Sequence, residues 1–322
     1  MMPTLRWLGA VAGGVLASTL AFGQDYPNRA VKIVVPFTAG SATDILARTV
    51  GQKLAEMWNQ TVVVDNRAGA GGTIGAGVVA KSPPDGYTLM VHSAAHAVNP
   101  FIYPALSYDT LKDFVQVVPL AGQPNVLVVA PATGYKTVAE LIADAKKKPG
   151  TLNFGSAGIG SGTHINGEKF KLAAGINVVH IPYKGTPEAL TDTMAARVAY
   201  FFSPISAALP LVRDGKLLAL GVTSAKRSSV LPNAPTIAES GLPGFDYNLW
   251  IGLFAPAGTP ADVVEKINRD VQRVLREPDV RERMTALGAE AMAMSPAEFD
   301  KFMRAEMDDA AKVVKAAAIK VQ

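Results

Sequence analysis

Short hydrophobic runs alternate with segments of helical periodicity along most of the chain. The run "VKIVVPF", residues 31–37, has the length of a buried strand. The segment that follows, "ILARTVGQKLAEMW", places apolar residues at helical spacing. The same alternation continues with predicted strands at 61–66 and 87–92 around a predicted helix at 72–81. Strands that alternate with helices predict an α/β layered sheet.

A second alternating set begins at Asn125, after an irregular stretch around Asn99 and Pro100 that limits any helix there. Its predicted strands are residues 125–131, 152–156, 178–183, 198–205 and 217–224, and its predicted helices are 137–148, 164–174, 186–197 and 208–216. From 260 onward the pattern is helical, and no strand alternates with these helices. We therefore predict two α/β lobes around a ligand cleft, formed by residues 24–123 plus 248–322 and by residues 124–247.

The N-terminus carries the pattern of a secretory signal peptide. Arg6 precedes an apolar run, residues 7–20, and the small residues Ala21 and Gly23 follow it. The run is shorter than the ~20 apolar residues of a membrane span. We expect residues 1–23 to be removed by cleavage between Gly23 and Gln24, and the mature protein to be periplasmic.

Composition narrows the chemistry further. The 322 residues are 49% hydrophobic and include no cysteine, which excludes disulfides, thiolate metal sites and a cysteine nucleophile. The net charge is +4, and basic residues are spread along the chain except for "KKK" at 146–148. We expect a large core and no nucleic-acid partner.

Most catalytic and cofactor motifs are absent or out of frame. The glycines of "GAGGTIGAG" do not match the dinucleotide fingerprint, and neither "FGSAG" nor "GIGSG" has the G-x-S-x-G pattern of a hydrolase elbow. His92 and His96 have a spacing that could hold a metal on a helix, but no carboxylate lies between them, so loop histidines that form hydrogen bonds are the better interpretation. We expect no enzyme activity, no metal and no cofactor.

Two uncharged polar turns link a predicted strand to a predicted helix. In "PFTAGSATD", Ser41 and Asp44 have the spacing of a capping box. The other turn, "FGSAGIGSGTH", offers hydroxyls and glycines before a helix. Either turn alone could be an ordinary helix cap. Because there is one turn in each predicted lobe, and helix N-termini attract carboxylates, we favour a shared site for an anion.

Several long blocks of the sequence resemble the Bug, or TctC-like, receptors, which are extracytoplasmic solute-binding proteins of tripartite tricarboxylate transporters. The blocks are "YPNRAVKIVVPFTAGSATDILAR", "VVVDNRAGAGGTIGAGVVAKSPPDGYTLM", "NFGSAGIGSGTHINGEKF", "HIPYKGTPEALTD" and "LGVTSAKRSSVLPNAPTIAESGLPGF". They run in the family's order. The resemblance implies a type II periplasmic-binding-protein fold, whose two α/β lobes close over a small ligand.

The resemblance also implies which residues hold the ligand. In such receptors a carboxylate is gripped by one turn from each lobe, and a third segment lines the cleft. The implied set is Phe37, Thr38, Ala39, Gly40, Ser41, Ser93, Ala94, Ser156, Ala157, Gly160, Ser161, Thr163, His164, Ala199 and Phe202. Many members carry an aspartate where this chain has Ala199 in "RVAYFF", so an acidic partner for a ligand amine is missing at that position. Phe202 is a candidate for an apolar wall.

The ligand class therefore stays open among dicarboxylates, tricarboxylates, aromatic carboxylates and amino acids. The leading interpretation is a monomeric receptor that hands a small carboxylate to membrane permease subunits. The alternatives are a ligand-sensing partner of a membrane signalling protein and, from another class, an exported hydrolase.

Overall fold

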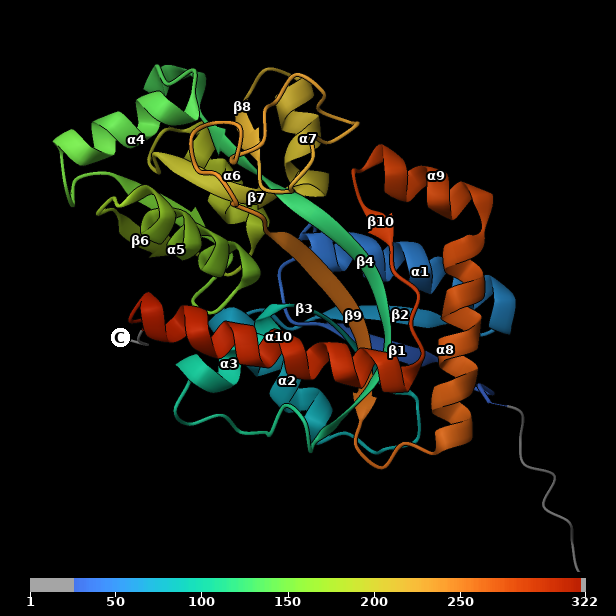
Figure 1. Ribbon diagram of the computed structural model, residues 1–322. Helices are drawn as coiled ribbons and strands as arrows, with labels where there is room; N and C mark the ends of the chain where they lie inside the picture. The colour runs from blue at the N-terminus through green and yellow to red at the C-terminus, as the bar shows by residue number, and fades with distance from the viewer. Residues whose placement is uncertain (1–25, 320–322) are drawn as a thin grey trace, which may run out of the picture.

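The computed structural model describes residues 26–319, and the predicted signal peptide lies outside them. The chain forms one curled sheet with the strand order β2-β1-β3-β9-β4-β7-β5-β6, and β8 and β10 pair with β4 beside this path. Helices cover the sheet at both ends (Figure 1). Among the described residues no helix is both long and apolar enough to cross a lipid bilayer.

The N-terminal strands form one end of the sheet. β1 (Val31–Val35) runs parallel to β2 (Val62–Asn66) and to β3 (Thr88–Ser93). The apolar stripe of α1 (Ala42–Trp58) is buried against them. The β1 run reads as continuously hydrophobic because only Lys32 of its five residues is exposed.

The segment after β3 differs from the prediction. The irregular stretch around Asn99 is helical, because α3 (Ala95–Ile102) continues through Pro100. Proline at this point removes only one helical N–H near the end of a short helix. A single 3-10 turn, Ala70–Gly72, and α2 (Thr73–Ala80) connect β2 to β3.

Two long strands join the halves of the molecule. β4 (Phe114–Val129) pairs with β9 (Asn248–Pro256) through Pro124, and with β7 and β8 from Asn125 onward. The prediction that this strand begins at Asn125 was wrong, because β4 begins at Phe114. The sequence hid this part of the strand because Pro119 and Pro124 interrupt it, and the register with β9 shifts around Pro119.

The other end of the sheet comes from the middle of the chain. It contains β5 (Asn153–Ser156), β6 (Val179–Pro182), β7 (Tyr200–Pro204) and β8 (Leu218–Val222). Its helices are α4 (Val138–Lys147), α5 (Gly162–Ala174), α6 (Thr186–Met194) and α7 (Ile205–Arg213). We call residues 26–123 and 248–319 the first lobe and residues 124–247 the second lobe.

The C-terminal helices return to the first lobe. α8 (Ala261–Arg276) buries its apolar face in the same core as β1 and α1, and α9 (Pro278–Ala286) follows it. A two-residue strand, β10 (Glu290–Ala291), pairs with β4, so the prediction that this tail lacks strands was wrong. α10 (Pro296–Ala316) then lies across the front of the molecule, below α5 and above α3 (Figure 1).

Thr223 fixes the two chain connections to each other. Its hydroxyl bonds the carbonyl oxygens of Asn125 (3.1 Å) and Tyr247 (2.7 Å). Its backbone also bonds both residues, and its side chain is fully buried. The connections between the lobes are thereby held side by side, so rotation of one lobe against the other is confined to a short region.

Candidate functional site

The first polar turn lies where β1 ends and α1 begins. Gly40 has φ +82°, a conformation that favours glycine, and its N–H donates to Oδ2 of Asp44 (2.9 Å). Burial raises the pKa of Asp44, but hydrogen bonds from Arg48 and Gly40 outweigh it and hold the pKa below its ordinary value. The predicted capping box was wrong in detail, because Asp44 reaches Gly40 and the Ser41 side chain does not cap α1.

The second polar turn lies where β5 ends and α5 begins. Ser161 caps α5 by accepting the N–H of His164 (3.2 Å), and Thr163 Oγ1 accepts the N–H of Ala157 (2.9 Å). The N–H of Gly160 donates to Nδ1 of His164 (3.1 Å), so that nitrogen carries no proton. Burial lowers the pKa of His164 to about 3, which keeps this acceptor neutral.

The two turns meet across the seam between the lobes, at a cavity that three helices point toward. The cavity is lined by Phe37, Ser41, Ala42, Thr43, Ser93, Ala157, Ser161, Gly162, Thr163, Thr186, Pro204 and Leu249. Ala42, Gly162 and Thr186 are the first residues of α1, α5 and α6. The first N–H groups of a helix have no partner inside the helix, so those of α1 and α5 are available to an anion. In α6 the N–H of Thr186 donates to Ser41 Oγ (3.4 Å) and Pro187 has no N–H, so this helix contributes mainly its dipole.

Among residues 26–319, no charged side chain lines this cavity. One hydroxyl in it is unusual: Oγ1 of Thr43 is buried and has no hydrogen-bond partner within the described residues. The cavity volume is about 20 Å³, enough for about one water molecule. A dicarboxylate is larger than this volume, so the cavity must widen to admit one.

The lobes touch directly around the cavity. The Tyr103 hydroxyl donates to the carbonyl oxygen of Ile159 (2.8 Å), and Thr38 Oγ1 donates to Glu188 Oε2 (3.0 Å). A side chain at Gly71 would overlap the Ile159 carbonyl oxygen, and one at Gly160 would approach Asn99 Oδ1 to 2.7 Å. Glycines on both faces therefore allow a closed arrangement of the lobes.

The structure brings only part of the implied residue set to the cavity. Phe37, Ser41, Ser93, Ala157, Ser161 and Thr163 line it. Thr38, Ala39 and Gly40 lie in the turn beside it, where Ala39 and Gly40 are exposed. Gly160 faces Asn99, and Ala94 lines a different cavity. Ser156 bonds His180 (2.6 Å), and His164 stacks on His180 with 3.9 Å between ring centroids.

Two implied residues lie elsewhere. Ala199 precedes β7, where its N–H donates to Asn153 (2.8 Å), whereas Pro204 at the opposite end of that strand lines the cavity. At ~3.3 Å per residue, roughly 16 Å separates the two positions. Phe202 is fully buried against Phe170 in the core of the second lobe. Neither Ala199 nor Phe202 therefore lines this cavity.

Sequence reasoning missed six lining residues: Ala42, Thr43, Gly162, Thr186, Pro204 and Leu249. Ala42, Thr43 and Gly162 lie inside the quoted turns, so their places as first helical residues were the available signal. Gly185 has the capping position of α6, and Thr186 begins the helix. Its N–H approaches Ser41 Oγ (3.4 Å) from the opposite lobe, a contact that the sequence pattern does not indicate.

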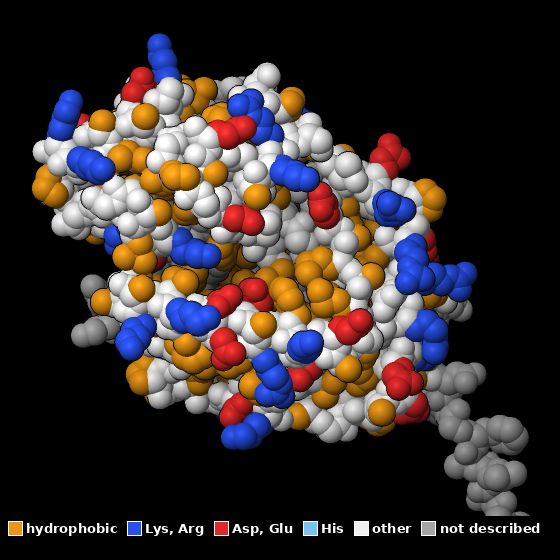
Figure 2. Space-filling model, in the orientation of Figure 1, with side chains coloured by type: hydrophobic (Ala, Val, Ile, Leu, Met, Phe, Trp, Pro, Cys, Tyr) orange, Lys and Arg blue, Asp and Glu red, His pale blue; other side chains and the backbone are white. Residues whose placement is uncertain are grey.

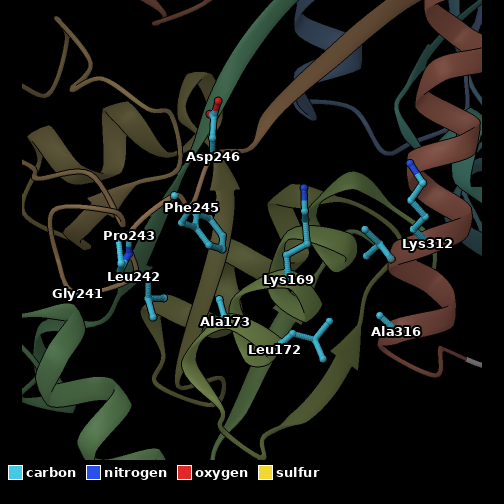
Figure 3. A pocket seen from close by; sticks show the side chains of 12 residues that line it. Lys169, Leu172, Ala173, Gly241, Leu242, Pro243, Phe245, Asp246, Lys312 and Ala316 are labelled. Carbon is cyan, nitrogen blue, oxygen red and sulfur yellow. The ribbon is translucent and has the colours of Figure 1, made fainter.

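A larger cavity lies on the front of the seam, between α5 and α10 (Figure 3). Its volume is about 790 Å³, and its walls are mostly apolar, with Leu172, Leu242 and Phe245 from the second lobe and Val313 from α10. Hydrophobic side chains also gather in the hollow above α10 (Figure 2). Three helix N-termini converge on the smaller cavity, which makes it the better candidate for an anion site.

Two α/β lobes joined by long strands, with a cavity at the seam, form the fold predicted for a solute-binding protein. A family model described as "Tripartite tricarboxylate transporter family receptor" matches residues 46–319, so the chain belongs to that receptor family. The family resemblance and the predicted fold class are confirmed.

Relatives and solved structures agree with this assignment. The protein BugT of Bordetella pertussis is 36% identical over 93% of this chain and 92% of its own length. The structure of R. palustris Rpa4515 with adipate is 37% identical, with a TM-score of 0.89 over 92% of this chain and 100% of that one. MatC from Rhodopseudomonas palustris with bound malate is 34% identical, with a TM-score of 0.85 over 90% of this chain and 100% of that one.

Proposed function

We propose that this protein is a periplasmic receptor that binds a small carboxylate between its lobes and presents it to the membrane subunits of a tripartite tricarboxylate-type transporter. The observation that carries the proposal is the convergence of the N-termini of α1, α5 and α6 on a buried cavity without a charged side chain. Adipate and malate in two similar proteins support a carboxylate ligand.

The physics of closure connects this site to transport. Backbone N–H groups and helix dipoles hold an anion more strongly once water is excluded from around it. A ligand that contacts both lobes stabilises the closed state by its difference in affinity between closed and open states. A membrane partner can then distinguish loaded from empty receptor by the relative position of the lobes.

We infer that the protein is not an enzyme. Ser156 and His180 form the pair that comes nearest to an activated nucleophile, but the Ser156 hydroxyl is fully buried and also accepts the N–H of Gly158 (3.0 Å). A substrate cannot reach it in this arrangement. Turnover of ester and amide libraries by the purified protein would contradict this inference.

The remaining features of the proposal are export and assembly. We expect cleavage between Gly23 and Gln24, which N-terminal sequencing of the exported protein would test, and a monomer, which light scattering would test. A sensing role with the same fold is the alternative, and loss of uptake on deletion of the gene, restored only with the permease, would favour transport.

The decisive experiment for the proposed function is mass spectrometry of the ligand released from purified native protein, followed by calorimetry with adipate, malate and the released compound. Binding of at least one small carboxylate at one site per chain is the expected result. A released ligand without a carboxylate, together with no heat from any carboxylate tested, would refute the proposal.

A further inference from the structure

One carboxylate lies at the edge of the proposed site and contacts it across the seam. Glu188, in the first turn of α6, accepts a hydrogen bond from Thr38 Oγ1 (3.0 Å). Thr38 belongs to the turn of the first lobe that begins α1, whereas Glu188 belongs to the second lobe. The contact therefore forms only when the lobes close, and it places the Glu188 carboxylate beside the first polar turn.

Gly185 shows how near this carboxylate is to the cavity. A Cβ atom at Gly185 would lie 3.0 Å from Ser41 Oγ and 3.1 Å from Glu188 Oε2, and it would overlap Thr38 Oγ1. Ser41 and Thr186 line the cavity itself. Glu188 is thus separated from the cavity by one hydroxyl layer.

The charges around Glu188 leave it without a cationic partner. Within residues 26–319, Glu188 forms no salt bridge: no lysine, arginine or histidine nitrogen lies within 4.0 Å of its carboxylate oxygens. Asp44, the carboxylate of the first polar turn, forms a salt bridge with Arg48 (2.9 Å), which compensates its negative charge. Lys184 is exposed and forms no ion pair within this range in the described chain. The cavity lining adds no positive side chain.

This arrangement separates two kinds of charge within the cleft. The helix N-termini attract a carboxylate at one end of a ligand. The Glu188 carboxylate has no cationic side-chain partner in the described chain, so it repels a second anionic group beside it and attracts a cationic one. The effect is strengthened where closure excludes water.

We propose that Glu188 selects the ligand of this receptor, favouring a carboxylate whose other end is an ammonium or a neutral donor over a dicarboxylate. The inference rests on the proposed carboxylate site and refines its substrate class. Glu188 takes the role that the resemblance assigned to an acidic group at position 199, from a different element of the second lobe.

Three ligands of equal chain length separate the effect of charge from that of size. Adipate ends in a second carboxylate, 6-aminohexanoate in an ammonium, and hexanoate in a methyl group. Calorimetry should give the affinity order 6-aminohexanoate, then hexanoate, then adipate for the unaltered protein. Glu188→Gln should raise the affinity for adipate relative to 6-aminohexanoate by at least about tenfold, since it removes one like charge near the distal end.

Two further variants exclude simpler explanations. The glutamine of Glu188→Gln still accepts the hydrogen bond of Thr38, so closure is preserved. Thr38→Val keeps the charge but removes the bond, and it should weaken all three ligands without changing their order. Asp214→Asn alters the net charge by the same amount at an exposed residue that does not line the cavity, and should change no ratio.

The outcomes distinguish this inference from the proposed function. If the three ligands bind but Glu188→Gln leaves the adipate to 6-aminohexanoate ratio unchanged, the role of Glu188 is refuted and the carboxylate site stands. A preference for adipate in the unaltered protein would also refute it. If no carboxylate binds to any variant that keeps its thermal transition, the site and the role of Glu188 fail together.

Discussion

Replacing Gly71 by alanine should weaken ligand binding by preventing full closure of the lobes. Gly71 has φ +60°, and a Cβ atom there would overlap the backbone carbonyl oxygen of Ile159 on the opposite lobe. Cβ atoms in proteins keep at least 3.0 Å from such an atom, so the lobes must part by on the order of 1 Å. One hydrogen bond beside this point crosses the seam and is at risk, from Tyr103 to the carbonyl oxygen of Ile159.

The expected loss of affinity follows from this hydrogen bond. A hydrogen bond contributes about 0.5–1.5 kcal/mol, so its loss corresponds to roughly 2- to 13-fold in the dissociation constant. Gly175→Ala is a matched control, because Gly175 also has φ +60° but no atom lies within 4 Å of its Cβ position. Both variants should lose about 1 kcal/mol of stability from the backbone conformation.

Calorimetry with the released ligand measures the difference between these variants. Spin labels on an otherwise cysteine-free chain, placed at the exposed residues Lys136 and Arg269 of the two lobes, report the interlobe distance. Gly71→Ala should lengthen that distance in the bound state, and Gly175→Ala should not. Equal affinity in both variants would refute the claim that this contact limits closure.

Three further predictions concern a hydroxyl, a helix contact and pH. Thr43→Val should lower ligand affinity about threefold or more while leaving the denaturation midpoint equal or higher, because it removes a buried hydroxyl that has no partner in the described chain. Val314→Ala on α10 should raise the open population of the ligand-free protein in the spin-label measurement, because this side chain belongs to a hydrophobic cluster that crosses the seam. The control Val271→Ala, in the core of the first lobe, should lower only stability. An unchanged open population in Val314→Ala would contradict this prediction. Burial lowers the pKa of His164 to about 3 and of His180 to about 2 in the folded protein, whereas an unfolded histidine has a pKa of ~6.5. Below pH ~6.5 the unfolded chain therefore binds more protons than the folded one, and stability should fall by up to about 1.4 kcal/mol per histidine for each unit by which the pH is lowered. Denaturation midpoints that do not change from pH 6.5 to 5 would refute this prediction.

Strands and helices could be predicted from the sequence where a single hydrophobic periodicity continued without interruption. β1 and α1 follow from an apolar run and a helical repeat in adjacent segments. The predicted strand was shorter than β4 because Pro119 and Pro124 interrupt the hydrophobic pattern. In the structure, pairing with β9 and with β7 makes β4 one continuous strand. Local chemistry indicates a break there, whereas tertiary pairing decides the structure.

Part of the candidate site could be predicted from the sequence for a different reason. Both polar turns could be found because helix N-termini carry local signals such as Ser41 and Ser161. Thr186 and Glu188 could not be assigned to the site, because only closure of the lobes brings the start of α6 against Thr38 and Ser41. For Ala199, the motif position does not reveal which end of β7 faces the cavity.

The central claim is that backbone N–H groups at helix N-termini hold the anion, and amide NMR tests it most directly. Addition of a bound carboxylate should shift the amide signals of Ala42, Thr43, Gly162 and Thr163 and slow their hydrogen exchange. The amide of Gly175, which caps the far end of α5, should not change. Saturable binding that leaves the first four amides unperturbed, and perturbs residues around Leu172 and Leu242 instead, would contradict the account.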